Sequence, residues 1–319
     1  MGYQKLNIRE IEAVPEKFYD PDITVTGEPR AFVDPRDLET LWINTGSLCN
    51  LTCENCYIES SPTNDQLAYI SLSEVTNLLD EIAAENFQTS EIAFTGGEPF
   101  LNDDMLPILE LCLQRGFQVL VLTNGMKTMH RIKDFLAQLN TTYPGALKLR
   151  VSLDHYSEEL HAKERGKQSW KPAIQSLKWL SDNNFSFSVA GRTYWGEDEK
   201  SLREGYRFLF EKENINLNSD DPMQLVLFPE MDLSVDVPEI TTNCWEVLNK
   251  DPADIMCSNS RMVVKRKGDA SPSVMACTLL PYDQRFNLGK NLKESWRRVK
   301  LNHPHCAKFC VLGGGSCSG

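Results

Sequence analysis

Long apolar runs are missing from this chain. None of its 319 residues lies in an apolar stretch that approaches the roughly 20 residues that a membrane-spanning helix needs. The start, Met1-Gly2-Tyr3-Gln4-Lys5, leads into polar sequence and lacks the apolar core of a secretory signal peptide. We therefore expect a cytoplasmic protein without a membrane partner.

Basic residues are also scarce. The chain has 33 Lys and Arg against 45 Asp and Glu, which gives a formal net charge of −12. Nucleic-acid binding needs a cationic surface, so we expect no nucleic-acid partner. An anionic substrate needs only one local Arg/Lys pocket and stays compatible with this charge. The chain also lacks a P-loop, a GxGxxG motif and a Ser/His/Asp order, so phosphoryl transfer and nicotinamide chemistry have no support.

Cysteine, in contrast, is plentiful. The ten cysteines fall mainly into a triplet near residue 50 and a group in the last third of the chain. This grouping favours metal ligation in a reducing compartment over a disulfide framework. Cys112 stands apart in an apolar run and is typical of a buried thiol.

The triplet Cys49, Cys53 and Cys56 has the spacing CxxxCxxC and directly follows a short apolar segment. Three thiolates so close together can bind three corners of a four-iron cluster and leave the fourth iron open. That iron could chelate a small molecule through an amine and a carboxylate. A structural zinc site would need a fourth ligand, and the nearest candidates, Cys112 and His130, are distant in the sequence.

Together with Tyr57 and the turn Gly96-Gly97-Glu98-Pro99, this triplet resembles the motifs of the radical S-adenosylmethionine (SAM) superfamily. The resemblance implies that a reduced [4Fe–4S] cluster, held by the triplet, cleaves SAM and yields a 5′-deoxyadenosyl radical that abstracts hydrogen from a substrate. It also implies an external electron donor such as flavodoxin or ferredoxin.

Strand and helix patterns alternate about every thirty residues. The near-continuous apolar strands predict a parallel sheet buried on both faces. Six units fit a partial (β/α)6 TIM-like barrel, which the resemblance also implies. We expect an N-terminal extension over residues 1–40, the barrel over 41–232 and a cysteine-rich module over 233–319. The expected strands are 41–45, 91–95, 117–122, 147–153, 185–190 and 223–228. The expected helices begin near 71, 103, 127, 170 and 201, the third of them covering 127–139, and a further short helix is expected around 292–299.

Polar or glycine residues follow each expected strand, where such barrels place their chemistry. Gly96 and Gly97 permit a close backbone approach and would leave N–H and C=O groups free for the methionyl amine of SAM, with help from Glu98. Pro99 completes this turn, and a plain β-turn is the alternative. Asn124 follows the third strand and joins the predicted cofactor-binding residues.

The resemblance assigns further roles at this rim. Ser152 and Asp154, at the end of the fourth strand, would bind the ribose hydroxyls, although Asp154 could instead cap the next helix. Arg192 or Arg165 would hold the methionyl carboxylate, because a guanidinium suits bidentate contact. Tyr57 would lie by the adenine or simply pack. No catalytic acid or base can be named.

The last third of the chain is similar to the auxiliary-cluster modules called SPASM and twitch. A predicted hairpin over residues 261–275 has a cysteine at each foot, and more cysteines follow. The match is imperfect, because the gap from Gly268 to Cys277 is long and too few cysteines remain for two clusters. We expect one auxiliary [4Fe–4S] cluster, with structural zinc as the alternative, and we treat His303 and His305 as packing residues. The expected ligands are Cys257, Cys277, Cys306 and Cys310, with Cys317 in reserve and Cys244 as a ligand, a radical quencher or neither.

Three functions fit these motifs. The first is a radical SAM oxidoreductase or radical-transfer enzyme that acts on a small molecule by dehydrogenation, cyclisation or rearrangement. The second is a maturase of a ribosomally made peptide, which we place lower because residues 1–40, with four prolines, are too short and broken for a leader-binding winged helix. The third is a non-catalytic cluster scaffold or sensor, in which an open iron and the glycine turn would be redundant.

Overall fold

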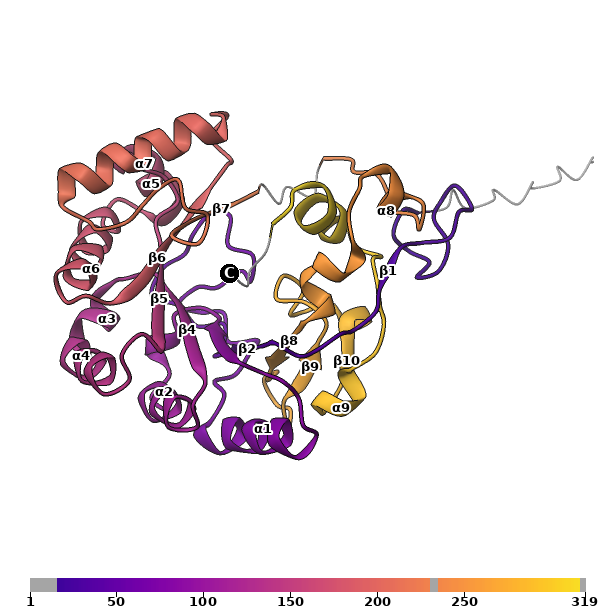
Figure 1. The fold of residues 1–319 in the computed structure, drawn as a ribbon, viewed down its shortest axis with the longest axis horizontal. Helices are drawn as coiled ribbons and strands as arrows, with labels where there is room; N and C mark the ends of the chain where they lie inside the picture. The colour runs from indigo at the N-terminus through magenta and orange to yellow at the C-terminus, as the bar shows by residue number, and fades with distance from the viewer. Residues whose placement is uncertain (1–15, 230–234, 316–319) are drawn as a thin grey trace, which may run out of the picture.

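The computed structural model describes residues 16–229 and 235–315 and centres on one curved, nine-stranded sheet (Figure 1). The strand order is β10-β9-β8-β2-β3-β4-β5-β6-β7, and the seven strands from β8 to β7 are parallel. The predicted partial (β/α)6 barrel is thereby confirmed. Its six strands are β2 (Thr40–Asn44), β3 (Glu91–Thr95), β4 (Gln118–Thr123), β5 (Leu147–Ser152), β6 (Ser186–Arg192) and β7 (Leu225–Phe228).

Helices connect successive strands and cover the convex face of the sheet (Figure 1). The first begins where the sequence predicts: the Ser71 side chain accepts the N–H of Glu74, and the Glu74 carboxylate accepts the N–H of Ser71, which forms a capping box. The helices of the barrel are α1 (Leu72–Ala84), α2 (Met105–Gln114), α3 (Lys127–Arg131), α4 (Lys133–Thr142), α5 (Glu158–Arg165), α6 (Trp170–Asp182) and α7 (Glu199–Glu213).

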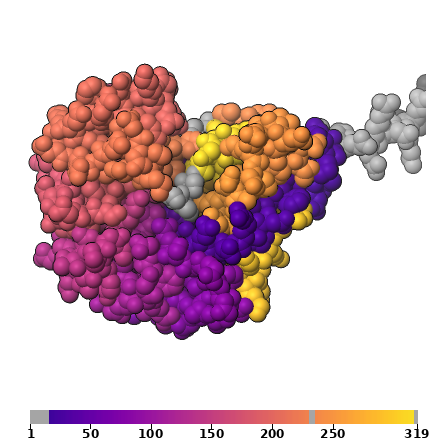
Figure 2. Space-filling model, in the orientation of Figure 1, coloured from indigo at the N-terminus to yellow at the C-terminus, as the bar shows by residue number. Residues whose placement is uncertain are grey.

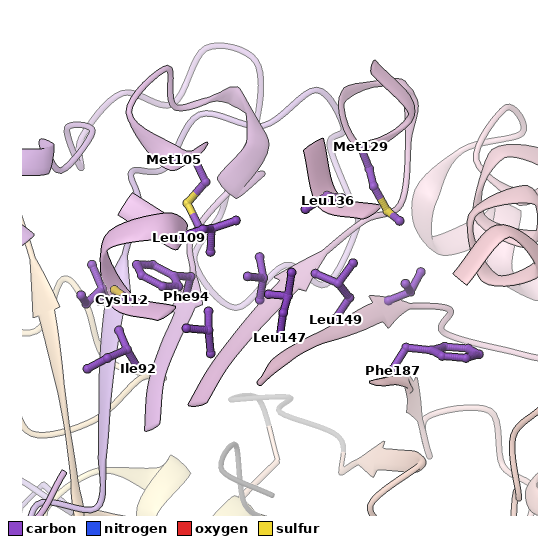
Figure 3. Packing of buried hydrophobic residues seen from close by; sticks show 14 of the residues in the cluster. Ile92, Phe94, Met105, Leu109, Cys112, Met129, Leu136, Leu147, Leu149 and Phe187 are labelled. Carbon is purple, nitrogen blue, oxygen red and sulfur yellow. The ribbon is translucent and has the colours of Figure 1, made fainter. Parts of the chain in front are cut away.

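The main core lies between the sheet and these helices (Figure 3). Alternate strand residues such as Phe94, Leu147 and Leu149 point to the helices and meet Met105 and Leu109 of α2 or residues of α3 and α4. Because strand side chains alternate between faces, the residues between them face the interior of the barrel. The interior-facing residues at the strand ends form part of the candidate active site.

The C-terminal strands extend the barrel sheet instead of forming a separate one. Strand β8 (Ser260–Val264) pairs in parallel with β2, and β9 (Ser273–Met275) and β10 (Asn287–Gly289) follow antiparallel. The C-terminal part therefore lies against the first strand of the barrel, and the N-terminal segment runs along it (Figure 2). No helix within the described residues is long and apolar enough to cross a bilayer.

Two helix predictions need correction. The helix expected over residues 127–139 is divided at Ile132, which joins α3 to α4 outside helical geometry. The short helix expected near residue 292 is α9 (Leu292–Ser295), shorter than predicted, because β11 (Val299–Lys300) pairs with β1 (Phe32–Val33). A long-range strand pair ends that helix, and the local sequence gives no sign of it. A further short helix, α8 (Cys244–Val247), precedes the hairpin.

Candidate active site

A cavity of about 1060 Å³, including its part open to solvent, lies at the C-terminal ends of strands β2 to β7. Its wall combines cysteine, glycine, charged and aromatic residues from loops that are far apart in the sequence. Most of the predicted cofactor-binding residues meet here, together with the whole triplet. These are Cys49, Cys53, Cys56, Tyr57, Gly96, Gly97, Asn124, Ser152, Asp154, Arg165 and Arg192.

The cysteine loop follows β2 and places three thiols on one side of this cavity. The backbone holds two of the sulfurs, since the N–H of Leu51 donates to Cys49 Sγ at 3.4 Å and the N–H of Ser60 donates to Cys56 Sγ at 3.3 Å. Burial raises the pKa of Cys49 to about 11 and also raises that of Cys53. A metal centre bound here must displace protons from both thiols.

The Gly96-Gly97 turn packs directly on the start of the cysteine loop. A Cβ at residue 97 would lie 2.0 Å from the carbonyl oxygen of Leu48, and Gly96 has a φ of +136°. The N–H of Gly97 donates to Gly46 and the N–H of Glu98 donates to Leu48. The expectation that the N–H groups of the two glycines stay free for a ligand therefore needs correction at Gly97, because its N–H bonds to the loop.

Glu98 and Pro99 are not among the residues that line the cavity. The Glu98 carboxylate is buried and accepts hydrogen bonds from the Thr123 hydroxyl at 2.8 Å and from the Asn124 N–H at 2.9 Å. Burial raises the pKa of Glu98 from 4.5 to about 7, against the effect of these hydrogen bonds. In this structure the Glu98 carboxylate fixes the end of β4 through these two hydrogen bonds.

Asp154 is the centre of a charge network in the cavity wall. Its carboxylate bonds to Arg165, with a second contact at 3.3 Å, and to Arg192 Nε at 3.2 Å. Burial alone would raise the pKa of Asp154, but the charges of Arg165 and Arg192 outweigh it and lower that pKa. Ser157 caps α5, so the alternative role of Asp154 as a helix cap is wrong.

Arg192 also connects this network to the cysteine loop. Its Nη2 donates to the carbonyl of Asn55 at 2.6 Å, and its guanidinium lies 4.8 Å from the centre of the Tyr57 ring. The buried Glu164 accepts the Asn55 backbone N–H at 2.9 Å and its side-chain amide at 2.8 Å. Asn55, one of the two residues between Cys53 and Cys56, is thus held by both Arg192 and Glu164. The sequence does not indicate this role of Glu164, because no local pattern links a helix residue to a loop residue 109 positions away.

Ser60 is a second residue that the sequence did not reveal. It lines the cavity with only 4% of its surface exposed, and its hydroxyl has no hydrogen-bond partner among the residues described. An unpaired buried hydroxyl costs free energy unless a ligand or water satisfies it. Together with three soft sulfur ligands, this open polar position fits a metal cluster with a polar small molecule beside it.

A second, smaller cavity of about 390 Å³, including its part open to solvent, lies in the C-terminal part. Cys257, Cys277, Cys306 and Cys310 all line it, between apolar walls, and His305 lines it as well. Cys244 is not in its wall, and Cys317 lies outside the described residues. The four thiols surround a space instead of meeting at a point: in residues 16–229 and 235–315 no three His, Cys, Asp or Glu side chains converge as a single ion would require.

The pKa of Glu98 generates a pH prediction. Because the folded pKa exceeds 4.5, this carboxyl stabilises the fold fully below about pH 4.5, and that contribution is lost as the pH rises through about 7. Glu98→Gln removes this dependence. Between pH 5 and pH 8 its free energy of unfolding should therefore rise relative to that of wild type by on the order of 3 kcal/mol. Urea unfolding of the metal-free, reduced proteins measures the difference. Parallel stability curves for the two proteins would contradict the shifted pKa.

Comparisons with known proteins identify relatives of this chain. The family model of the radical SAM superfamily matches residues 43–209. AlbA, the antilisterial bacteriocin subtilosin biosynthesis protein of Bacillus subtilis, is 35% identical over 143 residues, which cover 44% of this chain and 30% of AlbA. A probable GTP 3′,8-cyclase of Saccharolobus islandicus is 27% identical over 184 residues, 57% of this chain and 56% of the cyclase.

Two solved structures share the fold. Streptococcus suis SuiB superposes with a TM-score of 0.57 at 12% identity over 83% of this chain and 66% of SuiB. The structure of anSMEcpe with bound AdoMet gives 0.59 at 16% identity over 81% of this chain and 77% of that one. The chain spans less than two thirds of the curated relatives that it matches. The family match extends over more than half of the chain and includes the cysteine triplet and the glycine turn, and on this basis the chain belongs to the radical SAM superfamily.

Proposed function

We propose that this protein is a radical SAM enzyme whose active site is the cavity at the ends of strands β2 to β7. The observation that carries the proposal is the convergence of Cys49, Cys53 and Cys56 with the glycine turn on one cavity. When bound, the [4Fe–4S] cluster and SAM supply a 5′-deoxyadenosyl radical that removes a hydrogen atom from the substrate. The triplet would hold three irons of that cluster.

The wall that contains Arg165 and Arg192 would bind SAM. Asp154 pairs with both guanidinium groups and Glu164 lies 3.7 Å from that of Arg192, so two carboxylates balance the two positive charges. The planar N–H groups of an arginine suit the methionyl carboxylate. Ser152 at the end of β5 and the Ser60 hydroxyl would supply polar contacts to the ribose or the amino acid part, and Tyr57 an aromatic face for adenine.

The second cavity supports the proposal of one auxiliary [4Fe–4S] cluster. Cysteine is the usual ligand of such clusters, and Cys257, Cys277, Cys306 and Cys310 provide four from three separate segments. Leu279 lines both cavities, so the two proposed sites are neighbours, and the segment that follows Cys277 lies between them. The alternative is one structural zinc ion, which would hold the same four thiols at a tetrahedral centre.

The triplet and the C-terminal cysteines should bind iron independently. Wild-type protein, reconstituted anaerobically, should hold about eight irons per chain, and a variant with Cys49, Cys53 and Cys56 all replaced by Ala should hold about four. That variant should form no 5′-deoxyadenosine from SAM, as measured by chromatography under reducing conditions.

A matched control is Cys112→Ala, which removes a core thiol outside both cavities and should keep all of the iron. Formation of 5′-deoxyadenosine by the triple variant would contradict the catalytic assignment. About four irons and one zinc in the wild type would instead contradict the auxiliary cluster alone.

For the substrate we propose a peptide, with the small molecule as the second candidate. AlbA, the relative with the higher local identity, is named for bacteriocin biosynthesis, and SuiB has been solved bound to its precursor peptide SuiA. These relatives shift the preference away from the small molecule, which the short N-terminal segment favoured. The similarity to a probable GTP 3′,8-cyclase supports the small-molecule alternative. We propose an oxidoreductase or radical-transfer reaction, and the identity of the substrate will define which bond it forms or breaks.

Genes beside this one provide the substrate test. Co-expression with a short open reading frame from the neighbourhood should change the mass of the encoded peptide, as measured by mass spectrometry, and the triple-cysteine variant should leave that mass unchanged. Neighbouring genes for sugar or metabolite enzymes, with no short reading frame, would favour the small-molecule substrate instead.

A further inference from the structure

Asn124, the first residue after β4, reaches from the sheet to the first cysteine of the triplet. It is 5% exposed. Its side-chain Nδ2 donates to Asn50 Oδ1 at 2.8 Å and lies within hydrogen-bond range of Cys49 Sγ at 3.7 Å. A neutral amide donor therefore faces a sulfur that we assign to the cluster.

The orientation of this amide is fixed from the other side. Asn124 Oδ1 accepts the backbone N–H of Met126 at 3.0 Å. A backbone N–H can only donate, so the oxygen must point to Met126 and the nitrogen must lie on the side of Asn50 and Cys49, where its two hydrogens can serve both. This local turn, in which an Asn side chain bonds to the backbone two residues on, holds the amide without help from a ligand.

Glu98 holds the same strand end in place. Its carboxylate accepts the Asn124 backbone N–H at 2.9 Å and the Thr123 hydroxyl at 2.8 Å. A buried acceptor with two such donors restrains the backbone of residues 123 and 124. Contacts thus run from Glu98 through Asn124 to the Cys49 sulfur.

A hydrogen bond to a ligating sulfur affects the cluster's electronics. Reduction adds negative charge to the cluster and its thiolates, so an N–H donor at a sulfur stabilises the reduced form more than the oxidised form. Hydrogen bonds to the sulfurs are among the factors that set the reduction potentials of iron–sulfur clusters. Cys49 already has one such contact from the Leu51 backbone, and Asn124 adds a side chain that mutation can remove.

We propose that Asn124, held in position by Glu98, donates a hydrogen bond to the Cys49 sulfur and raises the reduction potential of the SAM-binding cluster. The proposal rests on the proposed function, since it needs Cys49 as a cluster ligand. Asn124 is a positioning residue in this scheme, because it acts on the cluster through Cys49.

The test is a potentiometric titration of the reconstituted holoenzyme without SAM, followed by EPR. In Asn124→Ser the hydroxyl can still accept the Met126 N–H, but it is too short to reach Cys49. We expect a fall of about three- to tenfold in the equilibrium constant for one-electron reduction, and a tenfold fall is about 59 mV toward more negative potential. The iron content should equal that of wild type.

Asn124→Asp is a second variant, for use if the serine variant loses its cluster. It keeps the shape and the acceptor for Met126 but has no donor for the sulfur, and it adds charge beside the cluster. Its potential should be lower than that of wild type by at least as much. Potentials equal to wild type in both variants would overturn the proposal.

Asn102→Ser is the matched control. Asn102 is also buried and forms the same kind of turn, since its Oδ1 accepts the N–H of Asp104 at 3.0 Å, but its Nδ2 donates to the carbonyl of Ile70. The control should keep the wild-type potential, and an equal shift there would overturn the specific role of Asn124. The signal to titrate is the one that disappears in the triple-cysteine variant, because the C-terminal cluster should remain in that variant. If the triple-cysteine variant loses no signal, the proposed function fails, and this inference fails with it.

Discussion

The site depends on the close contact between the Gly96-Gly97 turn and the backbone that precedes Cys49. Any side chain at residue 97 would meet the Leu48 carbonyl at 2.0 Å, so only glycine allows the end of β3 to lie against the loop. The hydrogen bonds from Gly97 to Gly46 and from Glu98 to Leu48 then join the two segments. The triplet is placed over the sheet by main-chain contacts, which do not depend on a bound metal.

Charge completes what these backbone contacts begin. Asp154 joins Arg165 to Arg192, and Arg192 and Glu164 together hold Asn55 in the loop. Asp154, Glu164 and Arg192 are buried, Arg165 is partly buried, and each has an oppositely charged or polar partner, as a site of low dielectric requires. The same arginines line the cavity, where their N–H groups are available to an anionic group. One network therefore both restrains the cysteine loop and places guanidinium donors at the cavity wall.

The sequence predicted what local patterns determine. Apolar strands of four to seven residues and the Ser71 cap gave the barrel, because burial on both faces and helix capping leave direct traces in the chain. The rule that chemistry lies at the ends of parallel strands brought Asn124, Ser152 and Arg192 to one cavity. The sequence placed Glu98 at the glycine turn but did not predict the direction of its side chain. That direction depends on the packing of β3 against β4, where Glu98 bonds to Thr123 and Asn124.

Contacts between distant segments could not be predicted. Glu164, Ser60 and Leu279 belong to a helix, a loop and the C-terminal part, and only the folded chain shows that they approach the triplet. The continuation of the barrel sheet into β8 is of the same kind, because parallel pairing with β2 requires no recognisable motif. Shape complementarity, and not residue type, decides these positions.

The most direct test of the central claim is EPR spectroscopy of the reduced, reconstituted protein with and without SAM. An open iron beside the glycine turn should bind the amine and the carboxylate of SAM. The account therefore predicts that SAM changes the signal of the triplet's cluster and leaves that of the C-terminal cluster nearly unchanged. Spectra that are indifferent to SAM at saturating concentration would contradict it.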